Sequence, residues 1–295
     1  MKISASPIRI VHDAQNRQLL PGALAYFEGD GPSKDTAVNR LVEGLGVTFD
    51  LFWKVYGRNS LDGKGLRLAA TVHYGKDLPN AFWDTEHQRV VVGDGDGTFY
   101  RNVSRSIEII GHHLTMGVIE HTARLEFTGQ AGALALSLAD VFGSLVKQRS
   151  LGQRADQADW LMGADATGPA FGHGALRSLK APGTAYNGDN VGTDLQVAAM
   201  KDYVHTREDK AGVLINSGIP AHTFYLVATA LGGHAWERAG QIWYDALTSG
   251  QLQQQAQFSD FARLTVTAAR DRYGQGEEEQ AVLDAWAQVQ VPTTT

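Results

Sequence analysis

The chain has 295 residues and no cysteine, which excludes disulfide bonds, thiolate metal sites and a cysteine nucleophile. It also lacks any run of about 18 consecutive apolar residues, the length that a transmembrane helix needs. The first residues, MKISASPIRIVHD, contain no apolar stretch as long as that of a signal peptide. These absences together predict a cytoplasmic protein.

Positive charge is scarce as well. The chain has 26 Lys and Arg against 32 Asp and Glu, a formal net charge of -6, and no basic cluster offsets this balance locally. We therefore do not expect nucleic acid or an anionic membrane as a partner. Hydrophobic residues make up 43% of the chain and charged residues 20%, which is ordinary for a soluble globular protein with a large core.

The most informative stretch spans residues 109–143, IIGHHLTMGVIEHTARLEFTGQAGALALSLADVFG. Its first half has helical character, and residues four apart on a helix lie on one face. His112 and Met116 have this spacing, with His113 beside them. The second half continues as another helix, which contains Leu136 and Asp140.

This stretch resembles the zinc-binding core of the thermolysin-like neutral metallopeptidases, most closely their protealysin-type members. In that family one helix carries H-E-x-x-H, and a second helix, about twenty residues on, carries N-E-x-x-S-D. The resemblance places His112 at the first zinc-ligand position, Met116 at the second and Leu136 at the third, with His113 at the position of the general base. A thioether is a poor zinc ligand and leucine is none, so the sequence predicts that the zinc site is lost and that no metal or cofactor is bound.

Two further positions differ in the same direction. The resemblance implies an oxyanion-stabilising Tyr where Phe127 stands and an oxyanion-stabilising His where Leu214 stands. Each such donor contributes about 2.7 to 4 kcal/mol to transition-state stabilisation. The sequence therefore predicts that the chain is not an active zinc peptidase.

Other parts of the family's cleft are retained. The segment 79–83, PNAFW, resembles the edge strand that binds substrate by strand addition, and supplies Asn80 and Ala81. Arg177 matches the arginine that holds a substrate carbonyl, and Asp209 begins the segment that ends at Leu214. We expect these residues at the rim of the cleft.

Two observations leave alternatives open. The apolar residues Met116, Phe127, Leu136 and Leu214 describe either an abandoned site filled with packed side chains or a pocket for an apolar ligand. His112 with Asp140 is either a buried hydrogen bond or a general base.

Two sites with acidic residues are predicted to have a structural role and not to bind a metal ion. The segment 94–97, DGDG, indicates a turn more than a metal site because it lacks the rest of an EF-hand. Lys147 stands where calcium-binding relatives have an acid opposite Glu108, which predicts a salt bridge there.

The resemblance covers nearly the whole chain and implies an α+β, thermolysin-like fold of two domains with a cleft between them. Residues 1–127 are expected to form a mixed α/β domain that includes the first site helix, and residues 128–295 a mainly helical domain. The pattern itself predicts a hairpin of strands over 8–11 and 23–28, a helix over 35–56 and four helices after residue 220.

The first functional hypothesis is a non-proteolytic pseudo-metallopeptidase whose apolar cleft binds a peptide or a hydrophobic small molecule. The alternative is a repurposed zinc-independent enzyme, such as a biosynthetic cyclase, isomerase or condensing enzyme. It would use His113 or the His112–Asp140 pair as general acid or base. A third hypothesis keeps a metal on His112 and His113 with other ligands.

Overall fold

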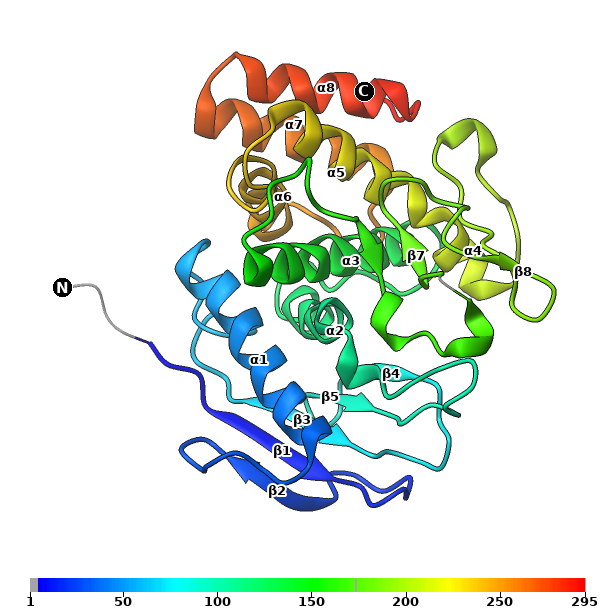
Figure 1. The fold of residues 1–295 in the computed structure, drawn as a ribbon. Helices are drawn as coiled ribbons and strands as arrows, with labels where there is room; N and C mark the ends of the chain where they lie inside the picture. Colours follow the sequence, from blue (N-terminus) through cyan, green and yellow to red (C-terminus); the bar gives the residue numbers. More distant parts are fainter. Residues whose placement is uncertain (1–4, 173, 295) are drawn as a thin grey trace.

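The computed structural model of the protein describes residues 5–172 and 174–294. Strands dominate the first third of the chain and helices the remainder (Figure 1). The strands are β1 (Arg9–Asp13), β2 (Ala23–Phe27), β3 (Leu68–Val72), β4 (Ala81–Asp84), β5 (Arg89–Val92), β6 (Leu161–Met162), β7 (Arg177–Ser178), β8 (Asn187–Gly188) and β9 (Gly192–Thr193). The helices are α1 (Thr36–Lys54), α2 (Ile107–Glu120), α3 (Gly129–Leu151), α4 (Asp209–Asn216), α5 (Gly218–Leu231), α6 (Arg238–Thr248), α7 (Phe258–Tyr273) and α8 (Glu277–Gln288).

The first five strands form one mixed sheet in the order β2-β1-β3-β5-β4. β1, β3 and β5 are parallel, whereas β2 and β4 pair antiparallel to their neighbours at the two edges. Side chains alternate between the two faces of a strand. Val11, Ala70 and Val90 belong to the main hydrophobic core and face α1 and α2, which lie over one side of the sheet (Figure 1).

Helix α1 begins where its sequence predicts. The Asp35 side chain accepts a hydrogen bond of 2.8 Å from the backbone N–H of Ala37, which satisfies one of the free donors at the helix start. Leu41, Leu45 and Phe52 recur at helical spacing and are fully buried. The apolar stripe of α1 therefore closes the core above the sheet.

Helices α2 and α3 cross in the centre of the molecule (Figure 1). Their backbones approach closely, because a Cβ atom on Gly143 would lie 2.3 Å from the backbone oxygen of Glu108. By length and composition α3 could span a membrane, but 83% of its most apolar window is buried inside the protein. It is thus the central core helix, and it holds the site residues of α2 in place.

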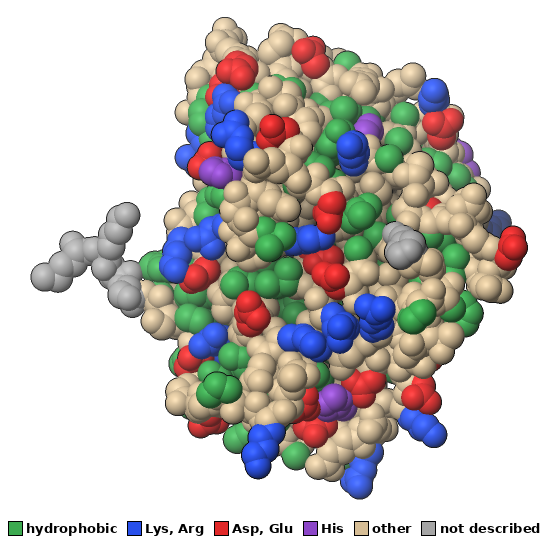
Figure 2. All heavy atoms as spheres, in the orientation of Figure 1, with side chains coloured by type: hydrophobic (Ala, Val, Ile, Leu, Met, Phe, Trp, Pro, Cys, Tyr) green, Lys and Arg blue, Asp and Glu red, His purple; other side chains and the backbone are tan. Residues whose placement is uncertain are grey.

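The helices after residue 217 pack into a helical layer, as the sequence predicts. Trp243 of α6 and Trp286 of α8 stack at 6.2 Å between ring centroids, and Phe261 of α7 meets both rings edge-on. The predicted α+β class is confirmed. The predicted division between residues 127 and 128 falls in the loop from α2 to α3 and stays a prediction. Charges of both signs are interspersed over the face that Figure 2 shows.

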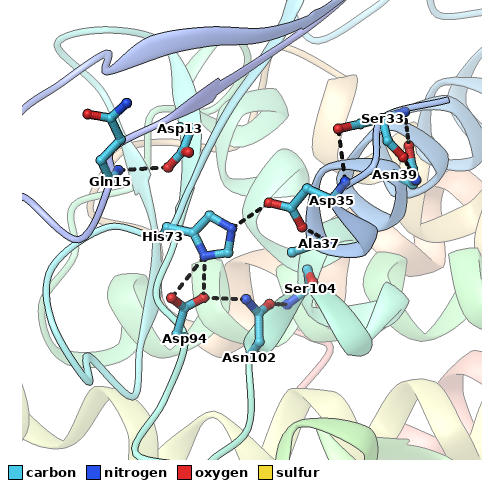
Figure 3. A network of polar contacts seen from close by, with 10 residues as sticks. All are labelled: Asp13, Gln15, Ser33, Asp35, Ala37, Asn39, His73, Asp94, Asn102 and Ser104. Carbon is cyan, nitrogen blue, oxygen red and sulfur yellow. Dashed lines mark hydrogen bonds and ion pairs between the residues drawn. The ribbon is translucent and has the colours of Figure 1, made fainter. Parts of the chain in front are cut away.

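A polar cluster joins the end of β3 to the start of α1 (Figure 3). His73 lies between two carboxylates, with Nδ1 2.7 Å from Asp94 and Nε2 2.7 Å from Asp35. The hydrogen bond with Asp94, reinforced by Asp35, outweighs burial and raises the pKa of His73 to about 9. The next acid, Asp96, accepts three backbone hydrogen bonds from residues 98 to 100, so the DGDG segment forms the predicted turn.

Candidate functional site

A pocket of about 800 Å³ opens between edge strand β4, helix α2 and the start of α3. Its lining consists of Ala81, Phe82, Trp83, Thr85, His112, His113, Met116, Ile119, Glu120, His121, Arg124, Leu125, Phe127, Leu136 and Lys210. Six of the predicted site residues are among these. Five of them come from β4, α2 and α3, which adjoin because α2 packs against both β4 and α3, and Phe127 lies in the loop before α3.

His112 is held from behind by a carboxylate on α3. Its Nδ1 lies 2.7 Å from Oδ1 of Asp140, and both side chains are almost completely buried. Arg177 donates two further hydrogen bonds to the same carboxylate, at 2.6 and 2.8 Å. Burial alone would raise the pKa of Asp140, but the charges of Arg177 and His112 outweigh it and keep that pKa well below its usual range. Asp140 is therefore ionised. Because Nδ1 of His112 is bound to Asp140, its Nε2 is the nitrogen available to interact with a ligand in the pocket.

His113 stands beside His112, with the two rings edge to face and their centroids 4.8 Å apart. Burial, followed by the proximity of His112 and Arg177, lowers the pKa of His113 well below that of a free histidine. The imidazole is thus neutral at physiological pH. A neutral ring has one nitrogen that accepts and one that donates a hydrogen bond.

The remaining wall of the pocket is apolar. Met116 follows His112 by one helical turn, and Leu136 of α3 and Phe127 complete this side. A zinc site needs three or four nitrogen, sulfur or oxygen ligands around one point. Across residues 5–172 and 174–294, no group of three His, Asp or Glu side chains is placed to hold a metal ion. The residues present do not fit the zinc that the family resemblance implies.

The other predicted binding residues lie outside the pocket lining. The Asn80 side chain accepts a hydrogen bond from the backbone N–H of Ala81 and so shapes the start of β4. Arg177 faces Asp140, behind His112. Asp209 caps a helical turn by accepting from the N–H groups of residues 214 and 215, and Leu214 is 41% exposed. Their predicted role in ligand binding stays a prediction.

Sequence reasoning missed several lining residues, of which Glu120 matters most. Its carboxylate accepts hydrogen bonds from Trp83 Nε1 at 2.6 Å and from Gln88 at 2.9 Å, which ties α2 to the edge strand. Helical spacing was the available signal, because Glu120 follows His112 and Met116 at intervals of four residues.

The segment 209–212 borders the pocket in an unusual backbone conformation. Asp209, Lys210, Ala211 and Gly212 have φ angles of 50°, 48°, 65° and 79°. Only glycine adopts this left-handed region without steric cost. Lys210 places its ammonium group 4.8 Å from the ring centroid of Phe127, a cation–π contact that closes one end of the pocket.

The predicted salt bridge near the far end of α3 is present. Lys147 Nζ lies 3.9 Å from Glu108 and 2.8 Å from Asp159. Glu108 also accepts hydrogen bonds from Ser106 Oγ and from the backbone of Gly163. The lysine supplies a positive charge to this buried acid.

Two family models together match most of the chain. Residues 23–120 match the model of the thermolysin metallopeptidase catalytic domain, and residues 123–291 match that of the thermolysin metallopeptidase alpha-helical domain. The chain is 50% identical over 265 residues to an extracellular metalloprotease of Pectobacterium carotovorum subsp. carotovorum, covering 90% of this chain and 76% of the relative. It is 45% identical over 284 residues to protease PrtS of Photorhabdus sp. (strain Az29), covering 95% of this chain and 76% of the relative.

A solved structure is similar over almost the whole chain. It is the precursor of protealysin, a metalloproteinase from Serratia proteamaculans, at 49% identity and a TM-score of 0.94, covering 99% of this chain and 90% of that one. The predicted thermolysin-like arrangement of an N-terminal α/β domain and a C-terminal helical domain is confirmed.

These relatives correct the predicted function. Proteins 45–50% identical to this chain are named proteases, which contradicts both the non-proteolytic pseudo-metallopeptidase and the repurposed cyclase, isomerase or condensing enzyme. Their metalloprotease names also conflict with the predicted loss of a zinc site. The error came from equating substitutions at Met116 and Leu136 with a change of reaction class, although the fold and the pocket are retained.

The predicted location is corrected too. A relative at 50% identity is named extracellular, which contradicts a cytoplasmic protein. The chain covers 76% of that relative, so the composition of its first residues carried no information about export.

Proposed function

Because this chain belongs to the thermolysin metallopeptidase family, we propose that it is a secreted peptidase that cleaves polypeptides in the pocket between β4 and α2. The protease names of relatives 45–50% identical to it support the reaction, and the extracellular metalloprotease of Pectobacterium supports secretion. The observation that carries the proposal is the pocket of about 800 Å³ with His112 and His113 on its floor.

We propose that the substrate lies along β4 as an added strand. β4 is an edge strand that pairs on one side with β5, and Ala81, Phe82, Trp83 and Thr85 border the pocket. An extended peptide satisfies the free backbone groups of such an edge and presents alternate side chains to the neighbouring pocket. The apolar wall around Phe127 favours a peptide with a large apolar side chain next to the cleaved bond.

The side chains on the floor of the pocket set the chemistry. We propose that Met116 and Leu136 do not bind zinc, so that the inherited ligand set is incomplete in this chain. His112 then serves as the general base: its Nε2 accepts the proton of an attacking water, and ionised Asp140 stabilises the resulting imidazolium. The His112 imidazolium then gives this proton to the leaving amine, which regenerates the base, and neutral His113 offers a hydrogen bond beside it. Phe127 and Leu214 offer no hydrogen bond to an oxyanion, so we expect slow cleavage compared with the relatives.

The test is peptide cleavage followed by mass spectrometry of the products. The purified chain is incubated with a peptide mixture rich in apolar residues, with and without a metal chelator. We expect slow, site-specific cleavage that persists in chelator and disappears in His112→Ala. His205→Ala, which changes an exposed histidine outside the pocket, is the matched control and should retain the activity.

Two results would contradict parts of this proposal. No cleavage above the His112→Ala background would refute the peptidase assignment. Cleavage that chelator abolishes and that depends on His112 would instead show that a metal does the work, held by His112 with ligands other than Met116 and Leu136.

A further inference from the structure

The sheet has a second pocket on its outer face, opposite α1 and α2. This pocket measures about 590 Å³, within the size range of small-molecule sites. Its lining comprises Ile10, His12, Leu24, Phe27, Leu66, Arg67, Ala69, Glu86, His87, Gln88 and Arg89. None of these residues lines the peptidase pocket described above.

Strand register explains which side chains meet there. Ile10 of β1 is aligned with Ala69 of β3, and Ala69 with Arg89 of β5. These three residues form one row across the parallel strands, and they are not members of the main hydrophobic core. Because successive residues of a strand point to opposite faces, the row lies on the side away from α1 and α2.

Arg89 is a buried cation in this row. Only 8% of its surface is exposed, and its Nη1 donates a hydrogen bond of 3.0 Å to Thr71 Oγ1. Within the described part of the chain, its Nε is buried without a hydrogen-bond partner. Burial lowers the pKa of Arg89; the charge of Asp84 opposes this shift and that of Arg67 adds to it, and the net effect is a lowered pKa. A buried guanidinium in this state lacks the counter-charge that such groups normally have.

The acid that the sheet places opposite Arg89 is engaged elsewhere. Asp84 of β4 is the direct cross-strand partner of Arg89. Its carboxylate instead accepts hydrogen bonds from His87, from the ring Nδ1 at 2.6 Å and from the backbone N–H at 3.2 Å. The space next to Arg89 therefore remains open to an anion from outside the chain.

The rest of the pocket combines neutral and apolar groups. His12 lies 3.4 Å from Nη1 of Arg89, and burial, with a contribution from Arg89, lowers the pKa of His12 so that it is neutral. Leu24 and Phe27 of β2 are 63% and 46% exposed, unusually high for large apolar side chains in one place. At the rim, the exposed Arg67 and Glu86 carry opposite charges.

We propose that this pocket binds a monocarboxylate with a hydrocarbon body. The carboxylate accepts hydrogen bonds from the guanidinium of Arg89, whose planar donors match the two oxygens of that group. The hydrocarbon chain lies against Leu24, Phe27 and Ile10. A single unpaired cation matches a single negative charge, so a carboxylate suits the site better than a dianionic phosphate.

The test uses decanoate as the probe on the full chain. Isothermal titration calorimetry should show saturable binding of decanoate. Decylamine, decanol and inorganic phosphate should bind at least about tenfold more weakly, because each lacks either the single anion or the apolar body. In wild-type protein, the NMR signals of Arg89 Nε–H and of the His12 ring should shift on titration. No saturable binding, or equal binding of decanol, would refute the proposal.

Variants then locate the site. Arg89→Met should weaken decanoate binding at least about thirtyfold, since removing one member of a buried charge pair has effects of this size. Arg101→Met, which changes an exposed arginine outside the pocket, is the matched control and should bind as the wild type does. If Arg89→Met does not fold, the NMR shifts of Arg89 and His12 in the wild-type protein test the location of the ligand. Saturable binding without these shifts would place the ligand elsewhere and refute the proposal.

Discussion

The guanidinium of Arg177 donates two hydrogen bonds, of 2.6 and 2.8 Å, to the carboxylate of Asp140. Asp140 in turn holds the ring of His112 at 2.7 Å. A residue of β7 therefore fixes a histidine of α2 through an acid of α3, and the three elements are joined at one buried carboxylate. The orientation of His112 depends on this arrangement, whatever reaction the pocket supports.

Arg177→Met should destabilise the fold. Removing one partner of a buried ion pair leaves the other charge uncompensated and costs about 3–5 kcal/mol. We expect a loss of this size in the free energy of unfolding measured in urea. Arg154→Met, which removes an exposed arginine 3.7 Å from Asp156, should change it by less than about 1 kcal/mol. Equal losses in both variants would show that the buried Arg177–Asp140 pair contributes no more to the free energy of unfolding than an exposed pair does.

Restoring the inherited ligands should create a zinc site. The triple variant His113→Glu, Met116→His and Leu136→Glu places imidazole and carboxylate groups around His112, which already has its orienting partner Asp140. We expect this variant to retain one zinc ion per chain after dialysis, and the wild type to retain none, as measured by elemental analysis. Adding His112→Ala to the triple variant should abolish retention. Stoichiometric zinc in the wild type would show that Met116 and Leu136 do not prevent metal binding.

His73 should make stability depend on alkaline pH. Its pKa is raised from the free value of 6.5 to about 9, so its contribution is fully present below 6.5 and is lost as pH rises through 9. The side chain is 24% exposed, and solvent screening reduces the contribution to on the order of 1 kcal/mol. Urea unfolding at several pH values between these limits should show this loss in the wild type.

Substitution of His73 tests whether this residue causes the loss of stability at alkaline pH. His73→Gln should lower stability at neutral pH and flatten the change between pH 6.5 and 9. His205→Gln, at an exposed position, serves as the control and should leave the profile unchanged. An unaltered alkaline profile in His73→Gln would assign the dependence to other groups.

Ala211→Gly should stabilise the protein. Ala211 has a φ of 65°, a left-handed conformation that costs an L-residue roughly 1–2 kcal/mol and glycine nothing. The greater freedom of glycine in the unfolded chain offsets part of that gain, so we expect a net increase of about 0.5–1 kcal/mol in the free energy of unfolding. Ala230→Gly, at an exposed position in the last turn of α5, should have the opposite sign and cost less than about 1 kcal/mol. Destabilisation by Ala211→Gly would mean that Ala211 makes contacts outweighing the strain.

Periodicity and helix-boundary residues predicted α1 and the helices after residue 220, whereas the two-domain arrangement was implied by the family resemblance. Asp35 marks the start of α1, and glycines such as Gly232 and Gly274 mark helix ends, because these residues satisfy local backbone requirements that no distant contact alters. The pocket was predicted in part. His112 and Met116 are close in sequence and share a helix face, whereas the contribution of Lys210 depends on a left-handed backbone that no pattern reports.

The unpaired charge of Arg89 could not be predicted either. From the sequence, Asp84 is the expected partner five residues away across a tight turn. His87, which lies in that turn, binds the Asp84 carboxylate in place of Arg89. Such a preference depends on side-chain geometry within about 3 Å, finer than any spacing rule resolves.

Lys147 lies between Glu108 and Asp159 and neutralises charge at this end of α3. The counter-charge at this corner is covalently attached to the polypeptide and cannot dissociate. Its presence therefore does not depend on the concentration of divalent cations in the solution. The end of α3 should keep its conformation whether or not calcium is present.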